Sequence, residues 1–256
     1  MGNHGPMHAQ PGVHGHPDTD APTPRGSGGY PRTTSVRPRR SALSAAQQRT
    51  WERLWPTLGR TVGSSAEPPL DAGLWFGREA PLVLEIGCGT GTSTLAMAQC
   101  EPDVNVVTVD VYRRGLAQLL CAIEREAVGN LRLIRGDAVD VLERLIAPAA
   151  LTGVRVFFPD PWPKTRHHKR RLLQPATVGL IADRLRPGGV LHVATDHTGY
   201  AAQIATVGDA EHRLRRVDPA AQALPISIMR PITKYETKAR QAGSSVTELL
   251  WERRRP

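Results

Sequence analysis

Short apolar runs alternate with helical patterns from residue 81 onward, and this alternation is the main structural signal of the chain. Strands are predicted at residues 82–86, 106–109, 131–134, 154–158 and 190–194, because each run is short, apolar and followed by turn residues. Helices are predicted after a cap at Thr92 or Ser93 and at residues 113–127, 139–146 and 175–185. Strands that alternate with helices predict an α/β fold with a parallel sheet and helices on both faces.

The first residues of the chain lack this alternation. Residues 1–31 hold many Gly, Pro and His residues and almost no large aliphatic side chains, so we expect a disordered leader. The leader histidines are irregularly spaced and no cysteine accompanies them, which favours a solvated tail over a metal site.

A basic segment at residues 32–80 separates this leader from the main domain, which we place at residues 81–256. Within the segment, Ser44 opens an amphipathic helix that we expect to end at Pro56 and to pack on the main domain. The remainder, residues 57–80, is predicted as loop.

Composition narrows the class of protein. Hydrophobic residues make up 40% of the 256 residues, enough for a packed core, and no apolar stretch approaches the length that spans a bilayer. Three cysteines without metal-type spacing indicate reduced thiols, so we expect a cytoplasmic protein without a metal. The net charge of +9 favours a polyanionic partner.

A glycine turn follows the first predicted strand at Gly87, Gly89 and Gly91, and three kinds of ligand compete for it. A phosphate loop needs a lysine after the glycines, and none is present. A dinucleotide fingerprint needs a small residue where Thr92 stands, and Glu85 would repel a pyrophosphate. A cofactor with an ammonium, a sulfonium and ribose hydroxyls suits this turn better.

One acidic residue lies at the end of each of three consecutive strands. Glu85 precedes the glycine turn, Asp110 ends the second strand and Asp137 follows the third. Each alone would be explained as a helix N-cap. Because ligands of open α/β sheets bind at the carboxyl ends of the strands, the three together predict a cofactor site.

The fourth predicted strand runs into a segment with three prolines, and the segment holds Asp160 and Trp162 on a restricted backbone. A basic run follows directly. Beside a reaction centre, such a run favours a grip on nucleic-acid phosphates over a merely solvated face. The residues we expect against RNA are Arg166, His167, His168, Lys169, Arg170 and Arg171.

Residues 81–195 resemble the class I S-adenosylmethionine-dependent methyltransferases. The string at residues 158–171 is similar to the signature of the tRNA (guanine-N7)-methyltransferase family of the bacterial type, and Arg-Pro-Ile-Thr-Lys-Tyr-Glu at 230–236 matches a second motif. Ala-Thr-Asp at 194–196 is a third match, and residues 32–55 are a weaker fourth. The resemblance spans about residues 32–252.

This resemblance implies a three-layer Rossmann-like fold with a mostly parallel, seven-stranded sheet. It also implies methyl transfer from S-adenosylmethionine to N7 of guanosine 46 in the variable loop of tRNA, by a monomer or a homodimer. Asp160 would be catalytic. The implied cofactor contacts are Glu85, Gly87, Gly89, Asp110, Asp137 and Asp160. The implied substrate contacts are Lys164, Asp196, Thr233, Lys234, Tyr235 and Glu236.

Guanine N7 carries a lone pair and no proton, so this reaction needs orientation and stabilisation of positive charge rather than a base. Asp160 has the charge for that role. Two other functions remain open from sequence. One is an amino-methyltransferase acting on adenine or cytosine, which places a related acidic-proline-aromatic turn after the fourth strand. The other is a catalytically silent RNA-binding subunit, although all four acidic positions are present.

Overall fold

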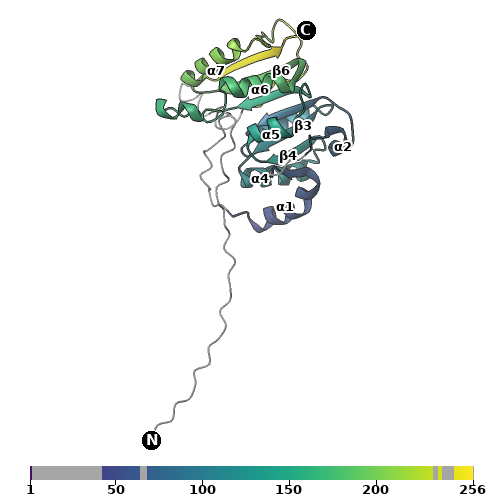
Figure 1. Ribbon diagram of the computed structural model, residues 1–256. Helices are drawn as coiled ribbons and strands as arrows, with labels where there is room; N and C mark the ends of the chain where they lie inside the picture. The colour runs from purple at the N-terminus through teal and green to yellow at the C-terminus, as the bar shows by residue number, and fades with distance from the viewer. Residues whose placement is uncertain (2–41, 64–67, 233–235, 238–244, 256) are drawn as a thin grey trace.

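The computed structural model describes residues 1, 42–63, 68–232, 236–237 and 245–255 (Figure 1). The leader that we expect at residues 1–31 therefore lies outside the described residues, apart from Met1. In the described chain, no helix is long and apolar enough to cross a membrane.

A mostly parallel sheet of eight strands forms the centre of the domain, in the order β1-β4-β3-β2-β5-β6-β8-β7. Among the described strands, β8 alone runs in the direction opposite to the others. The resemblance predicted seven strands, and the additional one is the short edge strand β1. The strands are β1 (Gly59–Thr61), β2 (Leu82–Ile86), β3 (Asn105–Asp110), β4 (Leu131–Arg135), β5 (Leu151–Phe157), β6 (Leu185–Thr195), β7 (Leu214–Arg216) and β8 (Thr247–Arg253).

Helices cover both faces of this sheet, which confirms the predicted three-layer α/β fold (Figure 1). The helices are α1 (Ala45–Leu58), α2 (Ala72–Phe76), α3 (Thr92–Cys100), α4 (Arg113–Glu126), α5 (Ala138–Arg144), α6 (Pro175–Arg184) and α7 (Thr198–Ala210), with a 3-10 helix η1 (Thr165–Arg170). One apolar cluster joins α5, α6 and α7 to the sheet, and a second joins α1, α3 and α4 to the opposite face.

The two faces follow from side-chain alternation along each strand. In β2, Leu84 and Ile86 belong to the first cluster, whereas Val83 belongs to the second. Glu85 shares the face of Val83 and therefore points toward the α3 side. Glu85 is only 2% exposed, and a buried carboxylate costs free energy unless it is compensated, so this position needs a functional explanation.

The N-terminal segment differs from its predicted form. A capping box at Ser44 opens α1 as expected, but the helix continues through Pro56 to Leu58. Pro56 has no N–H to donate to the carbonyl four residues earlier, and the helix ends two residues after it. Arg53 forms an ion pair with Glu124 of α4 at 2.5 Å, so α1 lies against the main domain.

Two further segments also differ from their predictions. The stretch predicted as loop at residues 57–80 contains both β1 and α2. The strand predicted at residues 190–194 begins five residues earlier, because Leu185 already pairs with Leu151 of β5, and the Arg-Pro-Gly-Gly stretch forms an irregularity before the next pair.

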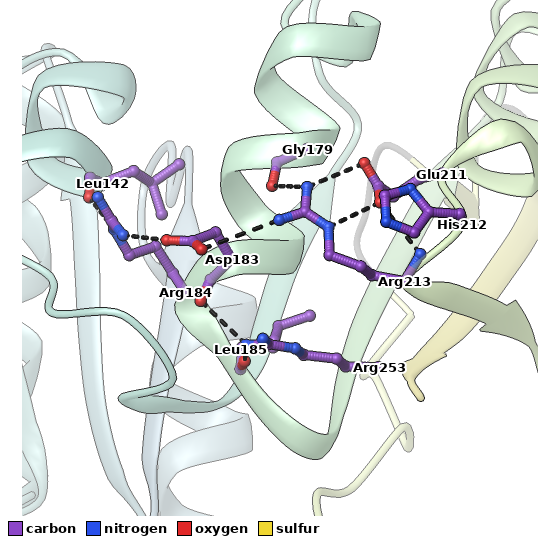
Figure 2. Close-up of polar contacts among 9 residues, drawn as sticks. All are labelled: Leu142, Gly179, Asp183, Arg184, Leu185, Glu211, His212, Arg213 and Arg253. Atoms are coloured by element: carbon purple, nitrogen blue, oxygen red, sulfur yellow. Dashed lines mark hydrogen bonds and ion pairs between the residues drawn. The ribbon is translucent and has the colours of Figure 1, made fainter. Parts of the chain in front are cut away.

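Arginine side chains tie α6 to the elements around it (Figure 2). Arg184 donates to the carbonyl of Leu142 at 2.7 Å, and Arg213 donates to the carbonyl of Gly179 at 2.8 Å. Arg253 of β8 donates to the carbonyls at the end of α6. Of these acceptors, the carbonyls of Leu142 and Asp183 lie in the last turns of α5 and α6, where the helix itself supplies no donor.

We expect Asn130→Ala to destabilise the fold by about 2 kcal/mol, because one side chain serves three buried carbonyls. Its Nδ2 lies 2.9 Å from the carbonyl oxygens of Ala98 and Glu101 and 3.0 Å from that of Val104. Urea unfolding measures the effect. The control is Gln99→Ala, an exposed change on α3 that should stay within about 0.5 kcal/mol of wild type. Equal stability of the two variants would contradict this role of Asn130.

Candidate active site

Two adjoining cavities open where the central parallel strands end. The smaller, of about 320 Å³, and the larger, of about 700 Å³, share the lining residues Gly87, Gly89, Phe157 and Phe158. Their position follows from topology, because β2 has β3 on one side and β5 on the other, and the connections leave the sheet in opposite directions there. The predicted cofactor turn and the predicted reaction segment therefore face the same cleft.

The glycine turn is held in place by Asp110 at the end of β3. One carboxylate oxygen of Asp110 accepts the N–H of Gly89 at 3.0 Å, and the other accepts the N–H of Tyr112 at 2.9 Å. Gly89 adopts a left-handed φ of 56°. Gly115 of α4 lies so close that a Cβ atom there would stand 1.9 Å from the carbonyl oxygen of Gly89. The turn is thus fixed from two elements.

Glu85 lies under the glycine turn and lines the larger cavity. Its Oε1 accepts the hydroxyl of Thr94 at 2.9 Å, whereas its Oε2 is buried and has no hydrogen-bond partner among the described residues. Burial raises the pKa of Glu85 to about 7, although the Thr94 hydrogen bond and the charge of Arg155 oppose the shift. The unpartnered oxygen fits an ammonium group, which would supply its missing donor.

The cleft favours positive charge in general. Burial raises the pKa of Asp110, and burial together with Asp110 and Glu85 raises the pKa of the Cys88 thiol. Desolvation is the largest cause of each shift, and only at Cys88 do the neighbouring carboxylates add to it. A ligand with an ammonium, a sulfonium and ribose hydroxyls complements such a cleft, whereas a pyrophosphate does not.

Asp137 occupies a different place from its two companions. It caps α5, and its side chain accepts the N–H of Val139 at 2.8 Å. Its neighbours Gly136 and Ala138 line the smaller cavity, but Asp137 itself does not. The structure therefore brings Glu85, Gly87, Gly89 and Asp110 to the cleft and places Asp137 at its margin.

The segment after β5 holds Asp160 in an unusual backbone. Phe158 and Trp162 have φ values of 50° and 42°, in the left-handed region that non-glycine residues rarely adopt. The N–H of Phe158 donates to the carbonyl of Ala194 at 2.7 Å and ties the segment to β6. Asp160 is exposed and lines the smaller cavity together with Asp110.

Arg171 corrects the prediction that placed it against RNA. Its side chain is buried, with the residue 2% exposed. Its guanidinium donates to the carbonyl of Pro161 at 2.7 Å and to Gln203 of α7 at 2.5 Å, and it lies over the ring of Tyr200. Arg171 therefore fixes the turn that carries Asp160. The sequence shows only a run of basic residues, and nothing in it distinguishes the buried arginine from the exposed ones.

The rest of the basic run lies on η1 at the surface. Arg166, Lys169 and Arg170 are exposed, while His167 and His168 are partly exposed. Arg170 lies over the ring of Trp162 at 5.0 Å, and His167 meets the same ring edge-on. The ring of Trp162 thus contacts two residues of the basic run. Desolvation and the nearby cations lower the pKa of His167, which disfavours its charged form.

The larger cavity has two more acidic residues on its wall, Asp196 and Glu236. Asp196 is exposed, while Glu236 is buried in an ion pair with Arg230. Lys164 is exposed and precedes the first turn of η1. The expected substrate contacts Thr233, Lys234 and Tyr235 lie outside the described residues. No group of His, Cys, Asp and Glu side chains in the described chain could hold a metal ion.

Comparison with known proteins identifies the family. Residues 79–249 match the family model described as "Putative methyltransferase". Over 99% of its length the chain is 66% identical to the complete tRNA (guanine-N(7)-)-methyltransferase of Mycobacterium avium strain 104. It is 60% identical, over the whole of both chains, to the protein of the same name from Mycobacterium ulcerans strain Agy99. The chain belongs to the tRNA (guanine-N7)-methyltransferase family.

A solved structure supports the fold assigned to this member of the tRNA (guanine-N7)-methyltransferase family. The aminoglycoside resistance methyltransferase NpmB1 aligns with a TM-score of 0.51 at 18% identity, over 75% of this chain and 97% of that one. At this identity the likeness concerns the fold alone, and it agrees with the Rossmann-like architecture described above.

The charge state of Glu85 predicts a pH-dependent gain in stability for Glu85→Gln. The pKa of about 7 in the folded chain lies above the ordinary 4.5, so the penalty for ionising Glu85 is absent at low pH and complete above pH 7. Glutamine keeps an acceptor for Thr94 and never ionises. The variant should exceed wild type by up to about 3 kcal/mol at pH 8 and by much less at pH 5.

Urea unfolding at the two pH values measures this difference. Glu52→Gln removes an exposed carboxylate from α1 and should give no comparable change with pH. A gain for Glu85→Gln that is the same at pH 5 and pH 8 would show that burial does not raise the pKa of Glu85.

Proposed function

We propose that the chain transfers the methyl group of S-adenosylmethionine to N7 of a guanosine in tRNA, at position 46 of the variable loop. The observation that carries the proposal is the juxtaposition of an acidic cofactor cleft with an exposed carboxylate, Asp160, and a surface helix of basic residues. The names of the highly identical relatives support the same reaction.

The residues of the cleft fit this cofactor. Glu85 offers an unpartnered, buried carboxylate oxygen to the ammonium group. Asp110 uses one lone pair of each oxygen on backbone N–H groups and keeps others for the two ribose hydroxyls. Gly87 and Gly89 let the backbone approach the ligand, and Asp137 borders the adenine end. When bound, the cofactor supplies an electrophilic methyl group on its sulfonium.

Asp160 acts on charge rather than on a proton. Guanine N7 would attack the methyl carbon through its lone pair while the bond from that carbon to sulfur breaks, so no base is required. The leaving sulfur would become a neutral thioether, and the positive charge would pass to the purine. A carboxylate held near the ring stabilises that charge while it develops. Arg171 and the strained corner at Phe158 hold Asp160 in place before the substrate arrives, so little reorganisation is needed.

The substrate contacts are assigned around this centre. Asp196 and Glu236 form the wall of the larger cavity, and we assign the nucleoside to that side together with Lys164, Thr233, Lys234 and Tyr235. Arg166, His167, His168, Lys169 and Arg170 form the surface for the phosphate backbone of tRNA. The division into a leader, a basic N-terminal segment at 32–80 and a methyltransferase domain at 81–256 remains part of this proposal.

Incubation with unmodified tRNA and labelled S-adenosylmethionine tests the function directly. Digestion and mass spectrometry should find N7-methylguanosine, and mapping should place it at position 46. A methyl group on an exocyclic amine of adenine or cytosine would favour the amino-methyltransferase alternative. Cofactor binding without any transfer would favour a silent RNA-binding subunit.

Asp160→Asn should lower turnover by about 10²-fold or more, because the amide keeps the shape but loses the charge that stabilises the methylated purine. Cofactor affinity, measured by calorimetry, should stay within a few-fold. The control is Asp103→Asn. Asp103 is an exposed carboxylate that precedes the amino end of β3, whereas the cleft lies at the carboxyl ends of the strands. Turnover near wild type in Asp160→Asn would remove Asp160 from the reaction centre.

Neutralising exposed charges of η1 should weaken tRNA binding and flatten its dependence on salt. In Arg166→Gln/Lys169→Gln, the slope of log K against log salt should fall by about 0.7–0.9 for each phosphate that the protein no longer neutralises. The matched control is Arg186→Gln/Arg255→Gln, which removes the same charge. These two arginines lie near the start of β6 and just after β8, at the end of the sheet away from the cleft. Equal slopes in the two double variants would show that η1 is not the RNA surface.

A further inference from the structure

Arg230 lies at the meeting point of the substrate side of the cleft and the reaction segment. Its side chain is 3% exposed, and its guanidinium forms two hydrogen bonds with Glu236, at 2.5 and 3.1 Å. A third bond, of 3.0 Å, goes to Glu248 of β8. The same group lies over the rings of Phe157 and Phe158, 5.7 and 5.0 Å from their centroids.

Each of these partners belongs to a different part of the site. Glu236 lines the larger cavity, and Phe157 and Phe158 line both cavities. Phe158 has a left-handed φ of 50° and stands two positions before Asp160. One guanidinium therefore joins the wall of the substrate cavity to the strained corner that carries the candidate catalytic carboxylate.

The network is anchored in the sheet rather than in loops. Glu248 forms a 2.7 Å hydrogen bond with the Nε2 atom of His192, and this histidine is fully buried in β6. The ring of His192 in turn meets Phe157 edge-on at 4.9 Å. Two paths, through Glu248 and through Phe157, thus tie Arg230 to the rigid centre of the fold.

The chemistry of the pair favours a fixed geometry. Burial alone would lower the pKa of Arg230, but the hydrogen bonds to Glu236 and Glu248 raise it, so the guanidinium stays charged. A planar guanidinium that binds both oxygens of a carboxylate fixes its orientation as well as its position, which a lysine cannot do. The remaining lone pairs of Glu236 are then directed by Arg230.

We propose that Arg230 is a positioning residue for methyl transfer. It holds Glu236 and the turn at Phe157 and Phe158 in a fixed position and orientation relative to Asp160. The inference rests on the proposed function for its kinetic consequence. Arg230 does not touch the reacting atoms. It acts through Glu236, and the loss of either partner therefore misplaces the same wall of the cavity.

A double-mutant cycle tests this role. Arg230→Met and Glu236→Gln should each lower kcat by about 10²-fold, because misplacement of a positioning group by about 1 Å has that effect. The double variant should be no slower than the worse single variant, since both changes break one unit. Arg230→Lys keeps the charge without the bidentate fork and should recover part of kcat. Cofactor affinity should stay within a few-fold throughout.

The matched control is Arg215→Met. Arg215 of β7, whose side chain is 43% exposed, pairs with Glu252 at 2.8 Å toward the other end of β8, so the change breaks an ion pair to the same strand outside the site. It should leave kcat unchanged. Losses that multiply in the Arg230/Glu236 cycle, or an equal loss of kcat in Arg215→Met, would overturn the positioning role.

Amide hydrogen exchange without tRNA separates this inference from the proposed function. Arg230→Met should speed exchange at residues 157–160 and 236–237, whereas Arg215→Met should not, and β2 should stay protected in both. If wild type makes no N7-methylguanosine, the proposed function fails while the exchange result still decides whether Arg230 holds these segments. Unchanged exchange in Arg230→Met would overturn the inference whatever the activity of wild type.

Discussion

A buried ion pair in the middle of the sheet joins the elements on the two sides of the cleft. Arg155 of β5 is fully buried and stands opposite Glu85 in the parallel register of β2 and β5. It forms an ion pair with Glu101 at 2.5 Å. Removing a charge from water costs several kcal/mol unless a partner compensates, so the position of Glu101 is fixed once Arg155 is placed.

Several elements follow from this constraint. Glu101 is the residue at the end of α3, the helix that begins at the glycine turn, so its pairing fixes the far end of that helix. The second oxygen of Glu101 accepts the N–H of Ser227 at 2.6 Å, and the guanidinium of Arg155 donates to the carbonyl of the same serine at 2.9 Å. Ser227 leads into the stretch that carries Arg230. The cofactor side and the substrate side of the cleft thus share one buried anchor.

Two neighbours explain how Glu85 can be buried and still ionise. Burial raises the pKa of its carboxyl, whereas the hydrogen bond from Thr94 and then the charge of Arg155 lower it. Together they leave the pKa of Glu85 at about 7. A bound ammonium group would then complete the ionisation, so cofactor binding and deprotonation of Glu85 are coupled.

The sequence predicted those parts of the fold in which a local pattern has one physical meaning. The strand at Leu82–Ile86 was found with both its ends, because a short apolar run before glycines fits few other structures. Glu85 and Asp110 were found for a related reason, since residues at the carboxyl ends of neighbouring parallel strands must meet. These inferences need only the order of elements along the chain.

Parts that depend on tertiary contacts were not predicted. The edge strand Gly59–Thr61 has no apolar alternation and exists because it pairs with β4. Arg171 looked like one more surface cation, and only the positions of Pro161 and Gln203 make it a buried clamp. Arg230 appeared merely as the first letter of a motif, because its partners Glu248 and Phe158 lie on other strands and loops. Contacts between segments that are far apart in the chain produce no hydrophobic periodicity in the sequence.

These two arginines, which the sequence did not single out, bear on the proposed reaction. Methylation at N7 removes no proton, so in that proposal catalysis depends on the orientation of the base and on the position of one negative charge, that of Asp160. Arg171 fixes the turn on one side of Asp160, and Arg230 fixes the aromatic corner on the other. Left-handed backbone at Phe158 and Trp162 costs of the order of 1–2 kcal/mol per residue and persists only where such contacts impose it. The two clamps therefore hold Asp160 in a strained turn that the prolines alone would not maintain.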